Sequence, residues 1–218
     1  MSALAGRCAI LCDFDGTVTL EEVSVALLKR YSVGEWEKAD RALLDGRTSL
    51  RETMAREFGL LRAPRAELEG FVRTIHLRGG FHELVAEARA RGAPPVILSE
   101  GLDFYIRAFL ELHGLKVEYR TNHAVFTANG ICVEHPFASM ECSYCGTCKK
   151  EQLLKFKQAG YSTIYIGDGI SDRCPARYAD VILARNGLLD HCRKERIECV
   201  PYEDFFDVLR VIRDRFWR

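Results

Sequence analysis

The sequence lacks an excess of charge of either sign, since its 218 residues include 31 lysines and arginines and 31 aspartates and glutamates. A chain without net charge has no general attraction for nucleic acid or acidic membranes, so we expect neither as a partner. It also lacks any apolar run approaching the ~18 residues that a membrane-spanning helix needs. The short apolar stretch at the N-terminus runs directly into Asp13, which argues against a cleaved signal peptide. We therefore predict a globular protein of the cytoplasm.

A disulfide framework is also unexpected, because the nine cysteines are odd in number and follow no secretion signal. Six of them are scattered, whereas Cys142, Cys145 and Cys148 recur at regular spacing in CSYCGTCK. Zinc sites use such spacing, but a closed structural site needs four ligands, and only three are local. The fourth would come from the neighbouring hairpin: Cys132, His123 or His135. Reduced thiols and a disulfide are the alternatives to zinc.

Apolar runs alternate with helical patterns along most of the chain, which predicts an α/β fold with a Rossmann-like parallel sheet. Residues 20–76 interrupt this alternation with helical patterns only. We therefore predict a helical cap at 20–76, inserted into an α/β core formed by residues 1–19 and 77–218. A strand near KVEYR is expected next, and HAVFTANGICVEH predicts a small β-hairpin that turns at Asn129–Gly130.

Polar side chains gather where the predicted strands end. Asp13 and Asp15 close the first strand, and their carboxylates can share one site because residues i and i+2 of a strand point to the same side. The carboxyl ends of parallel strands meet at one edge of a sheet, where ligands bind in folds of this class. Three other segments are expected at that edge: Ser99–Glu100–Gly101, Asp168 with Asp172, and the helix start at Lys149 and Lys150.

This set suits a divalent cation and a phosphate group. Mg²⁺ prefers hard oxygen ligands, and Asp13 and Asp168 would supply two of them. The cation would also offset the repulsion between the Asp13 and Asp15 carboxylates. A serine hydroxyl, free N–H groups at a helix start and a lysine are common donors to phosphate oxygens. We therefore expect a small phosphorylated metabolite as the partner of this site.

DFDGTVT, Ser99, a following lysine and GDGISD resemble, in order, the four motifs of the haloacid dehalogenase superfamily of phosphohydrolases. The all-helical cap after the first motif resembles the phosphoserine-phosphatase-like branch. The resemblance implies that Asp13 is the nucleophile and forms an aspartyl-phosphate, and that Asp15 is the general acid and base. It also implies that the Asp13 carboxylate, the Asp15 carbonyl and Asp168 hold Mg²⁺, with Asp172 orienting the metal waters and the lysine.

The resemblance further implies that Thr17, Ser99, Glu100 and Gly101 lie at the substrate. Glu100 departs from the usual motif, which continues Ser-Gly-Gly, and a carboxylate beside phosphate is unfavourable unless it points away. The catalytic lysine is either Lys149 or Lys150. We choose Lys149, because the lysine directly follows a cysteine in related sequences.

Shorter segments, among them NHAVF and ARNGLLDHCR, are similar to the methionine-salvage phosphatases that act on 2-hydroxy-3-keto-5-methylthiopentenyl 1-phosphate. The alternatives are phosphoserine phosphatases and phosphoethanolamine/phosphocholine phosphatases. In the former, an acid at the position of Glu22 contacts the substrate amine, although an acid at a helix start is equally expected to be structural. Arg56 is a candidate for a substrate carboxylate, with an exposed helix position as the alternative.

A different class of function is a non-catalytic interaction module built on the cysteine segment. The complete set of Asp13, Asp15, Lys149 and Asp168 argues against it, because a binding scaffold needs none of them. We expect a monomer or a homodimer.

Overall fold

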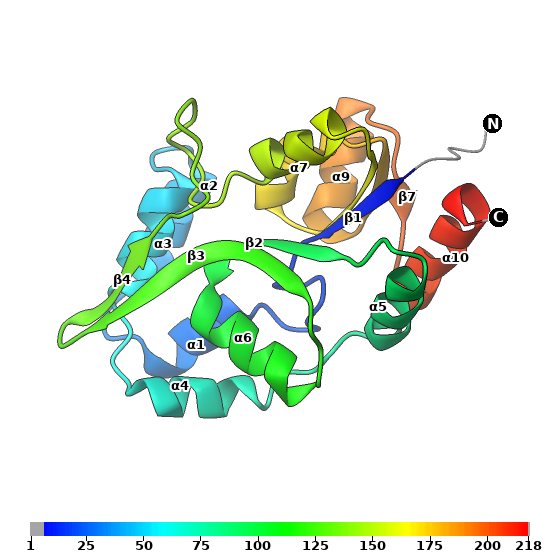
Figure 1. The fold of residues 1–218 in the computed structure, drawn as a ribbon. Helices are drawn as coiled ribbons and strands as arrows, with labels where there is room; N and C mark the ends of the chain where they lie inside the picture. The colour runs from blue at the N-terminus through cyan, green and yellow to red at the C-terminus, as the bar shows by residue number, and fades with distance from the viewer. Residues whose placement is uncertain (1–6, 218) are drawn as a thin grey trace.

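Seven strands form one sheet in the computed structural model, which describes residues 7–217 (Figure 1). Along the sheet the order is β4-β3-β2-β1-β5-β6-β7, and every neighbouring pair is parallel except the antiparallel β3 and β4. The strands are β1 (Cys8–Cys12), β2 (Val96–Leu102), β3 (Glu118–Thr127), β4 (Gly130–Glu134), β5 (Ser162–Gly167), β6 (Val181–Ala184) and β7 (Val200–Pro201). The predicted α/β class with a Rossmann-like parallel sheet is confirmed.

The helices fall into an inserted group and a group that covers the sheet. The inserted helices are α1 (Val23–Tyr31), α2 (Glu37–Leu44), α3 (Leu50–Phe58) and α4 (Arg65–Val72). The others are α5 (Phe81–Ala90), α6 (Asp103–Leu112), α7 (Lys149–Gln158), α8 (Arg173–Ala176), α9 (Asn186–Glu195) and α10 (Phe205–Phe216), with a short 3₁₀ turn at Ile170–Asp172. Among residues 7–217, no helix has the length and apolar character needed to cross a bilayer.

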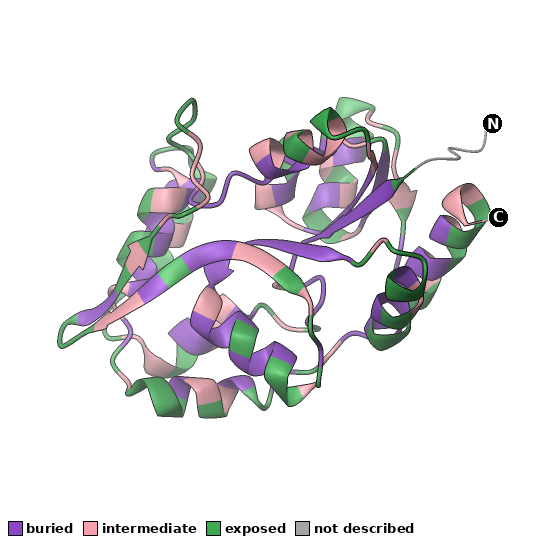
Figure 2. Cartoon of the chain, viewed as in Figure 1, coloured by how far each residue is buried: buried purple, intermediate pink, exposed green. Residues whose placement is uncertain are grey.

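The first strand is buried on both faces, which explains why its sequence is a continuous apolar run (Figure 2). Alternate residues face opposite sides of the sheet. Ile10 and Cys12 belong to the large core that includes α5, α6 and α10, whereas Leu11 packs with Leu153 of α7. The central strand therefore holds the residue that follows it, Asp13, at a fixed position in the middle of the sheet edge.

The hairpin occupies the predicted segment, with antiparallel pairs from His123–Glu134 to Thr127–Gly130, but its first strand is not separate from the strand before it. β3 is one continuous strand whose first half pairs with β2 and whose second half pairs with β4, where a separate strand and hairpin were expected. The two-residue turn is Ala128–Asn129, one residue before the predicted position, and Thr127 pairs with Gly130. β4 then packs beside α3, so the hairpin reaches from the sheet to the inserted helices. The short strand β7 was not predicted.

The inserted helices leave and return to the core at one place. Thr19 and Leu77 form an isolated antiparallel bridge, and the Leu20 N–H donates to the His76 carbonyl. These contacts agree with a cap at 20–76 on a core of 1–19 and 77–218, although its independence as a domain stays a prediction. Directly after the bridge, the buried Arg78 guanidinium donates to the carbonyls of Gly16, Thr17 and Thr19 at 2.7 to 3.0 Å.

Replacing Arg78 with methionine should lower the free energy of unfolding by about 2–5 kcal/mol, because several buried carbonyls lose their donor. Urea unfolding of Arg78→Met measures this loss. Arg193→Met is the control, since Arg193 is exposed on α9 and its removal should change stability by less than about 0.5 kcal/mol. Equal stability of the two variants would contradict a structural role for Arg78 at the cap hinge.

Candidate active site

A cavity of about 180 Å³ lies at the carboxyl ends of β1, β2 and β5, below the cap helices α1 and α3. Larger cavities of about 340 and 500 Å³ lie elsewhere, but neither is lined by the predicted motif residues. We therefore assign the site by its chemistry and not by its volume. The residues that line it are Asp13, Asp15, Glu22, Ser24, Leu50, Met54, Ser99, Glu100, Gly101, Asp168, Gly169, Ile170 and Ser171.

Lys149 joins two buried carboxylates beneath this cavity. Its ammonium lies 2.7 Å from Asp13 Oδ1 and 2.7 Å from Asp172 Oδ1, and it also donates to the Ser171 hydroxyl. Burial disfavours the charged ammonium, but the two carboxylates outweigh this and raise the pKa of Lys149. Lys150 instead lies over the ring of Tyr178, so Lys149 is the one of the two lysines that contacts the aspartates at the cavity.

Both carboxylate oxygens of Asp172 accept hydrogen bonds from other residues of the protein. Its Oδ1 accepts from Lys149 and from the Tyr165 hydroxyl, and its Oδ2 accepts from the N–H groups of Asp168 and Gly169. Gly167 makes room for this carboxylate, since a Cβ at that position would lie 2.5 Å from it. With all these donors satisfied, Asp172 orients Lys149 and the loop after β5.

Asp168 keeps its carboxylate at the cavity by two side-chain contacts. Thr17 donates to Oδ1 at 2.8 Å, and the Asn186 amide donates to Oδ2 at 3.3 Å. Thr17 is fully buried and does not line the cavity, so in this structure its contact is with Asp168, and its expected place at the substrate stays a prediction. Asn186 adopts a positive φ of 45°, which is uncommon for a residue with a side chain.

Asp15 is held from two sides. The N–H groups of Val23 and Ser24, at the start of α1, donate to its Oδ1 at 2.8 and 3.3 Å, and the Tyr105 hydroxyl donates to its Oδ2 at 2.7 Å. Burial raises the pKa of Asp15 to about 6, although these hydrogen bonds favour the charged form. A carboxyl with such a pKa exchanges protons readily near neutral pH.

The carboxylates at the cavity repel one another in the absence of a cation. Burial and the Asp172 carboxylate raise the pKa of Asp13 and of Asp168. Burial, followed by Asp15 and Asp168, raises the pKa of Glu22 to about 8. Carboxylate oxygens of Asp13, Asp168 and Asp172 lie within 4.8 Å of one another. This hard-oxygen set fits Mg²⁺, with Asp13 and Asp168 as the ligands whose oxygens are least engaged.

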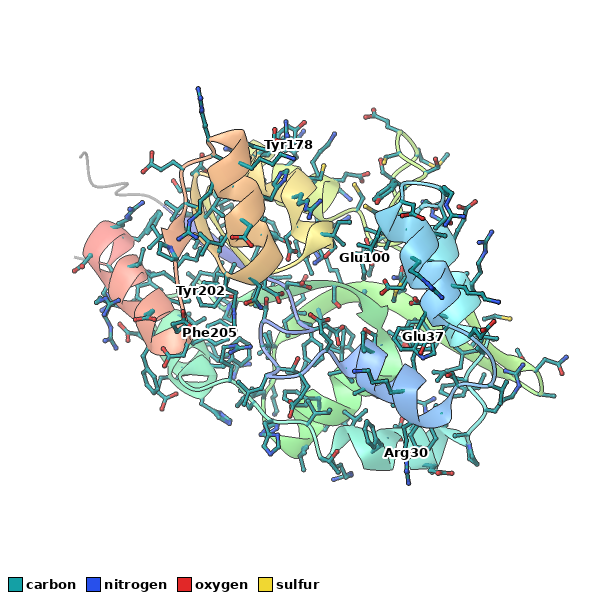
Figure 3. The ribbon with its side chains drawn as sticks, turned by 180° about the vertical axis from the view of Figure 1, so that it is seen from behind. Arg30, Glu37, Glu100, Tyr178, Tyr202 and Phe205 are labelled. Atoms are coloured by element: carbon teal, nitrogen blue, oxygen red, sulfur yellow. The ribbon has the colours of Figure 1, made fainter. Side chains whose placement is uncertain are left out.

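The second motif also reaches the cavity. Ser99 Oγ accepts from the Gly101 N–H at 2.9 Å. Glu100 points one oxygen away from the other motifs, because its Oε2 accepts from the N–H groups of Gly146 and Thr147. Glu100 thus anchors the cysteine segment to the core, and it is seen where α3 approaches the core in Figure 3.

The cysteine segment shows no arrangement for zinc. All nine cysteines are free thiols, and the one group within residues 7–217 that brings three metal-type side chains together is the aspartate set described above. Of the three expected fourth ligands, His123 hydrogen-bonds with Asp103 and His135 with Asn122. The third, Cys132, is an exposed free thiol. The zinc hypothesis for Cys142, Cys145 and Cys148 is therefore not supported.

Main-chain contacts give this segment a different role. The Arg51 guanidinium, at the start of α3, donates to the Cys145 carbonyl at 2.9 Å, and the Arg51 N–H donates to the Tyr144 carbonyl. The segment thus joins the cap to the helix that begins at Lys149. Within the segment, Cys142 is exposed, Cys145 is half-buried and Cys148 is buried.

Sequence reasoning missed Tyr105, Asn186 and Arg51. Asn186 lies within the segment ARNGLLDHCR, but its contact with Asp168 was not predicted. Tyr105 and Arg51 lie in helices without a quoted motif, and their contacts with Asp15 and with the cysteine segment left no signal in the periodicity. Arg56, in contrast, is exposed and does not line the cavity. Glu22 does line it, as expected for a residue that contacts the substrate.

Replacing Lys149 with methionine should lower the free energy of unfolding at pH 7 by about 3–5 kcal/mol in EDTA, because Asp13 and Asp172 are left as buried charges without their cation. Denaturant unfolding measures this change. Lys150→Met is the matched control, and loss of its contact with Tyr178 should cost about 1 kcal/mol or less. If the two variants lost the same stability, the buried ion pairs of Lys149 would not hold the site together.

Comparisons with known proteins agree with this geometry. A family model described as haloacid dehalogenase-like hydrolase matches residues 10–177. The 2-hydroxy-3-keto-5-methylthiopentenyl-1-phosphate phosphatase of Bacillus velezensis is 34% identical over 203 residues, which cover 91% of this chain and 87% of that protein. The phosphatase of the same name from Geobacillus kaustophilus is 35% identical over 210 residues, covering 94% of each.

Solved structures share the fold. A substrate-bound phosphoserine phosphatase superposes with a TM-score of 0.74 at 22% identity, over 94% of this chain and 98% of that one. A haloacid dehalogenase family hydrolase from Salmonella enterica gives a TM-score of 0.78 at 19% identity, over 98% of this chain and 73% of that one. Such identities speak for the fold alone, whereas the family model and the curated relatives cover most of the sequence. The chain therefore belongs to the haloacid dehalogenase-like hydrolases, in their phosphatase branch.

Proposed function

We propose that this enzyme is a Mg²⁺-dependent phosphomonoesterase that works through an aspartyl-phosphate on Asp13. The observation that carries the proposal is the junction of Asp13, Lys149 and Asp172. Asp13 Oδ1 accepts from Lys149 and from the Phe14 N–H, and Oδ2 has no protein donor among the described residues. One oxygen is thereby fixed, and the other is left to attack phosphorus.

The chain's own groups divide the reaction between them. Asp13 Oδ2 attacks the phosphorus of the ester, while the Lys149 ammonium stabilises negative charge at the attacking carboxylate and the phosphoryl oxygens. Asp15 gives a proton to the leaving oxygen, then takes one from the water that hydrolyses the aspartyl-phosphate. Ser99 and nearby N–H groups donate to the phosphate. Mg²⁺, held by Asp13 and Asp168 with the Asp15 carbonyl, would supply charge neutralisation and orient the phosphate.

For the substrate we propose 2-hydroxy-3-keto-5-methylthiopentenyl 1-phosphate, the compound in the names of the curated relatives. The cavity supports a phosphate ester with an apolar tail, because acidic groups line its floor while Leu50 and Met54 of α3 line the cap side. Both side chains are buried, with 6% and 9% of their surface exposed. Phosphoserine and phosphoethanolamine or phosphocholine remain the alternatives, since Glu22 would suit a substrate amine.

A role for the cap in catalysis follows from the residues of α3 that line the cavity. Residues 20–76 close over the site, exclude water during transfer and select the substrate. A cytoplasmic location, and a monomer or a homodimer, remain part of the proposal.

Asp13→Asn should lower kcat at least about 1,000-fold while leaving the melting temperature within a few degrees of the wild-type value, because the amide cannot act as the nucleophile. Phosphate release decides this, measured with Mg²⁺ on the methylthio enol-phosphate, phosphoserine, phosphoethanolamine and p-nitrophenyl phosphate. Wild-type turnover by Asp13→Asn would overturn the mechanism. A wild-type preference for another ester would overturn the substrate and leave the mechanism standing.

Glu22→Ala should change the ratios of kcat/KM among the natural esters about tenfold, with a smaller effect on p-nitrophenyl phosphate, because Glu22 belongs to the proposed cap and lines the cavity. Glu37→Ala is the control, since Glu37 is exposed on cap helix α2 (Figure 3). Equal losses on every ester would assign Glu22 to the structure of the cap and not to specificity.

A further inference from the structure

Tyr105 makes a contact with the catalytic acid that no sequence motif foretold. Its hydroxyl donates to Asp15 Oδ2 at 2.7 Å, and its ring is fully buried on α6. The ring packs against Phe14 and Phe104, with centroid distances of 6.1 and 5.4 Å. Phe14 lies between Asp13 and Asp15 in the chain, so the same side chain fixes the backbone of the first motif and the carboxyl group of Asp15.

The second motif is shaped around this contact. A Cβ on Gly101 would lie 1.8 Å from the Tyr105 hydroxyl oxygen and 2.9 Å from Asp15 Oδ2. A glycine is therefore required for the phenol to pass over the end of β2 and reach Asp15. The contact spans three elements that meet only in the folded protein: β2, α6 and the segment that follows β1.

The two oxygens of Asp15 differ in what their partners can do. Oδ1 accepts from two backbone N–H groups, which donate but never accept. Oδ2 accepts from a hydroxyl, which can donate to a carboxylate and can rotate to accept when the carboxyl is protonated. Oδ2 is therefore the oxygen whose partner tolerates both protonation states, and Asp15 lines the cavity.

We infer that Tyr105 is a positioning residue that makes Asp15 Oδ2 the proton-transferring atom of the reaction; this rests on the proposed function. In the first step the Oδ2 proton passes to the ester oxygen as its bond to phosphorus breaks. In the second step a water proton passes to Oδ2 as the water oxygen bonds to phosphorus and the Asp13–phosphate bond breaks. Without the phenol, Oδ2 turns away from the leaving group.

The test compares leaving groups in Tyr105→Phe. An alkoxide needs a proton to leave, whereas p-nitrophenolate is a stable anion and does not. For the wild-type enzyme and the variant, kcat/KM is measured on p-nitrophenyl phosphate and on the alkyl ester that the wild type hydrolyses best. We expect kcat/KM to fall about tenfold or more on the alkyl ester and less than about twofold on p-nitrophenyl phosphate. Because the second step also needs Oδ2, acid-quenched Tyr105→Phe should hold more phosphorylated protein during turnover of p-nitrophenyl phosphate.

Tyr165→Phe is the matched control, because it removes another buried hydroxyl that donates to a site carboxylate, Asp172, at 2.6 Å. Its losses should be equal on the two esters. Equal losses in Tyr105→Phe, with no added phosphorylated protein, would overturn the positioning role and leave the proposed function intact. Failure of the wild type to release phosphate from either ester would overturn both.

Discussion

The buried contact of Lys149 with Asp13 and Asp172 is the interaction on which the site depends. Burying any one of these charges alone would cost several kcal/mol. They are tolerated together because the Lys149 ammonium lies 2.7 Å from a carboxylate oxygen of Asp13 and 2.7 Å from one of Asp172. Asp13 follows β1, Lys149 begins α7, and Asp172 lies in the turn after β5. Their contact therefore fixes the relative positions of three segments, and it engages only one oxygen of Asp13, the proposed nucleophile.

Around this centre, the remaining polar groups serve chiefly to orient one another. Thr17 and Asn186 hold Asp168, Glu100 holds the segment before Lys149, and Arg78 holds the carbonyls of the loop that follows Asp15. Each of these contacts contributes to stability, because a buried polar group without a hydrogen-bond partner lowers the free energy of unfolding. The polar groups on the core side of the cavity are consequently held by several contacts each, while its cap side is formed by separate helices.

The sequence predicted the fold class and the strand-end residues because both follow from local patterns. A buried strand is recognised as an apolar run, and the first acidic residue marks its end. Asp13 and Asp168 could therefore be placed at the same edge of the sheet. The choice of Lys149 over Lys150 came from resemblance, and its contacts with Asp13 and Asp172 became visible only in the fold. The continuity of β3 could not be predicted, because it depends on pairing with both β2 and β4. The contacts of Tyr105 with Asp15 and of Asn186 with Asp168 could not be predicted, because they depend on which helix face turns toward a strand end. The regular cysteine spacing suggested a zinc site that the structure does not support. A local pattern in the sequence does not show whether the side chains converge in the fold.

The charge at the cavity has a consequence for how the proposed reaction is ordered. Asp13, Asp15, Asp168 and Glu22 line the space that a phosphate dianion must enter, and Lys149 is already shared by two carboxylates. Burial and neighbouring carboxylates raise the pKa of Asp13, Asp168 and Glu22. Acids that stay charged there repel a phosphate, so the protein alone presents a poor site for an anion. In the proposed reaction, a cation on Asp13 and Asp168 would reverse that balance, and by linkage the phosphate would strengthen cation binding by the same factor. Such coupling would account for the buried acids at the ends of the central strands of an enzyme whose proposed substrate is an anion.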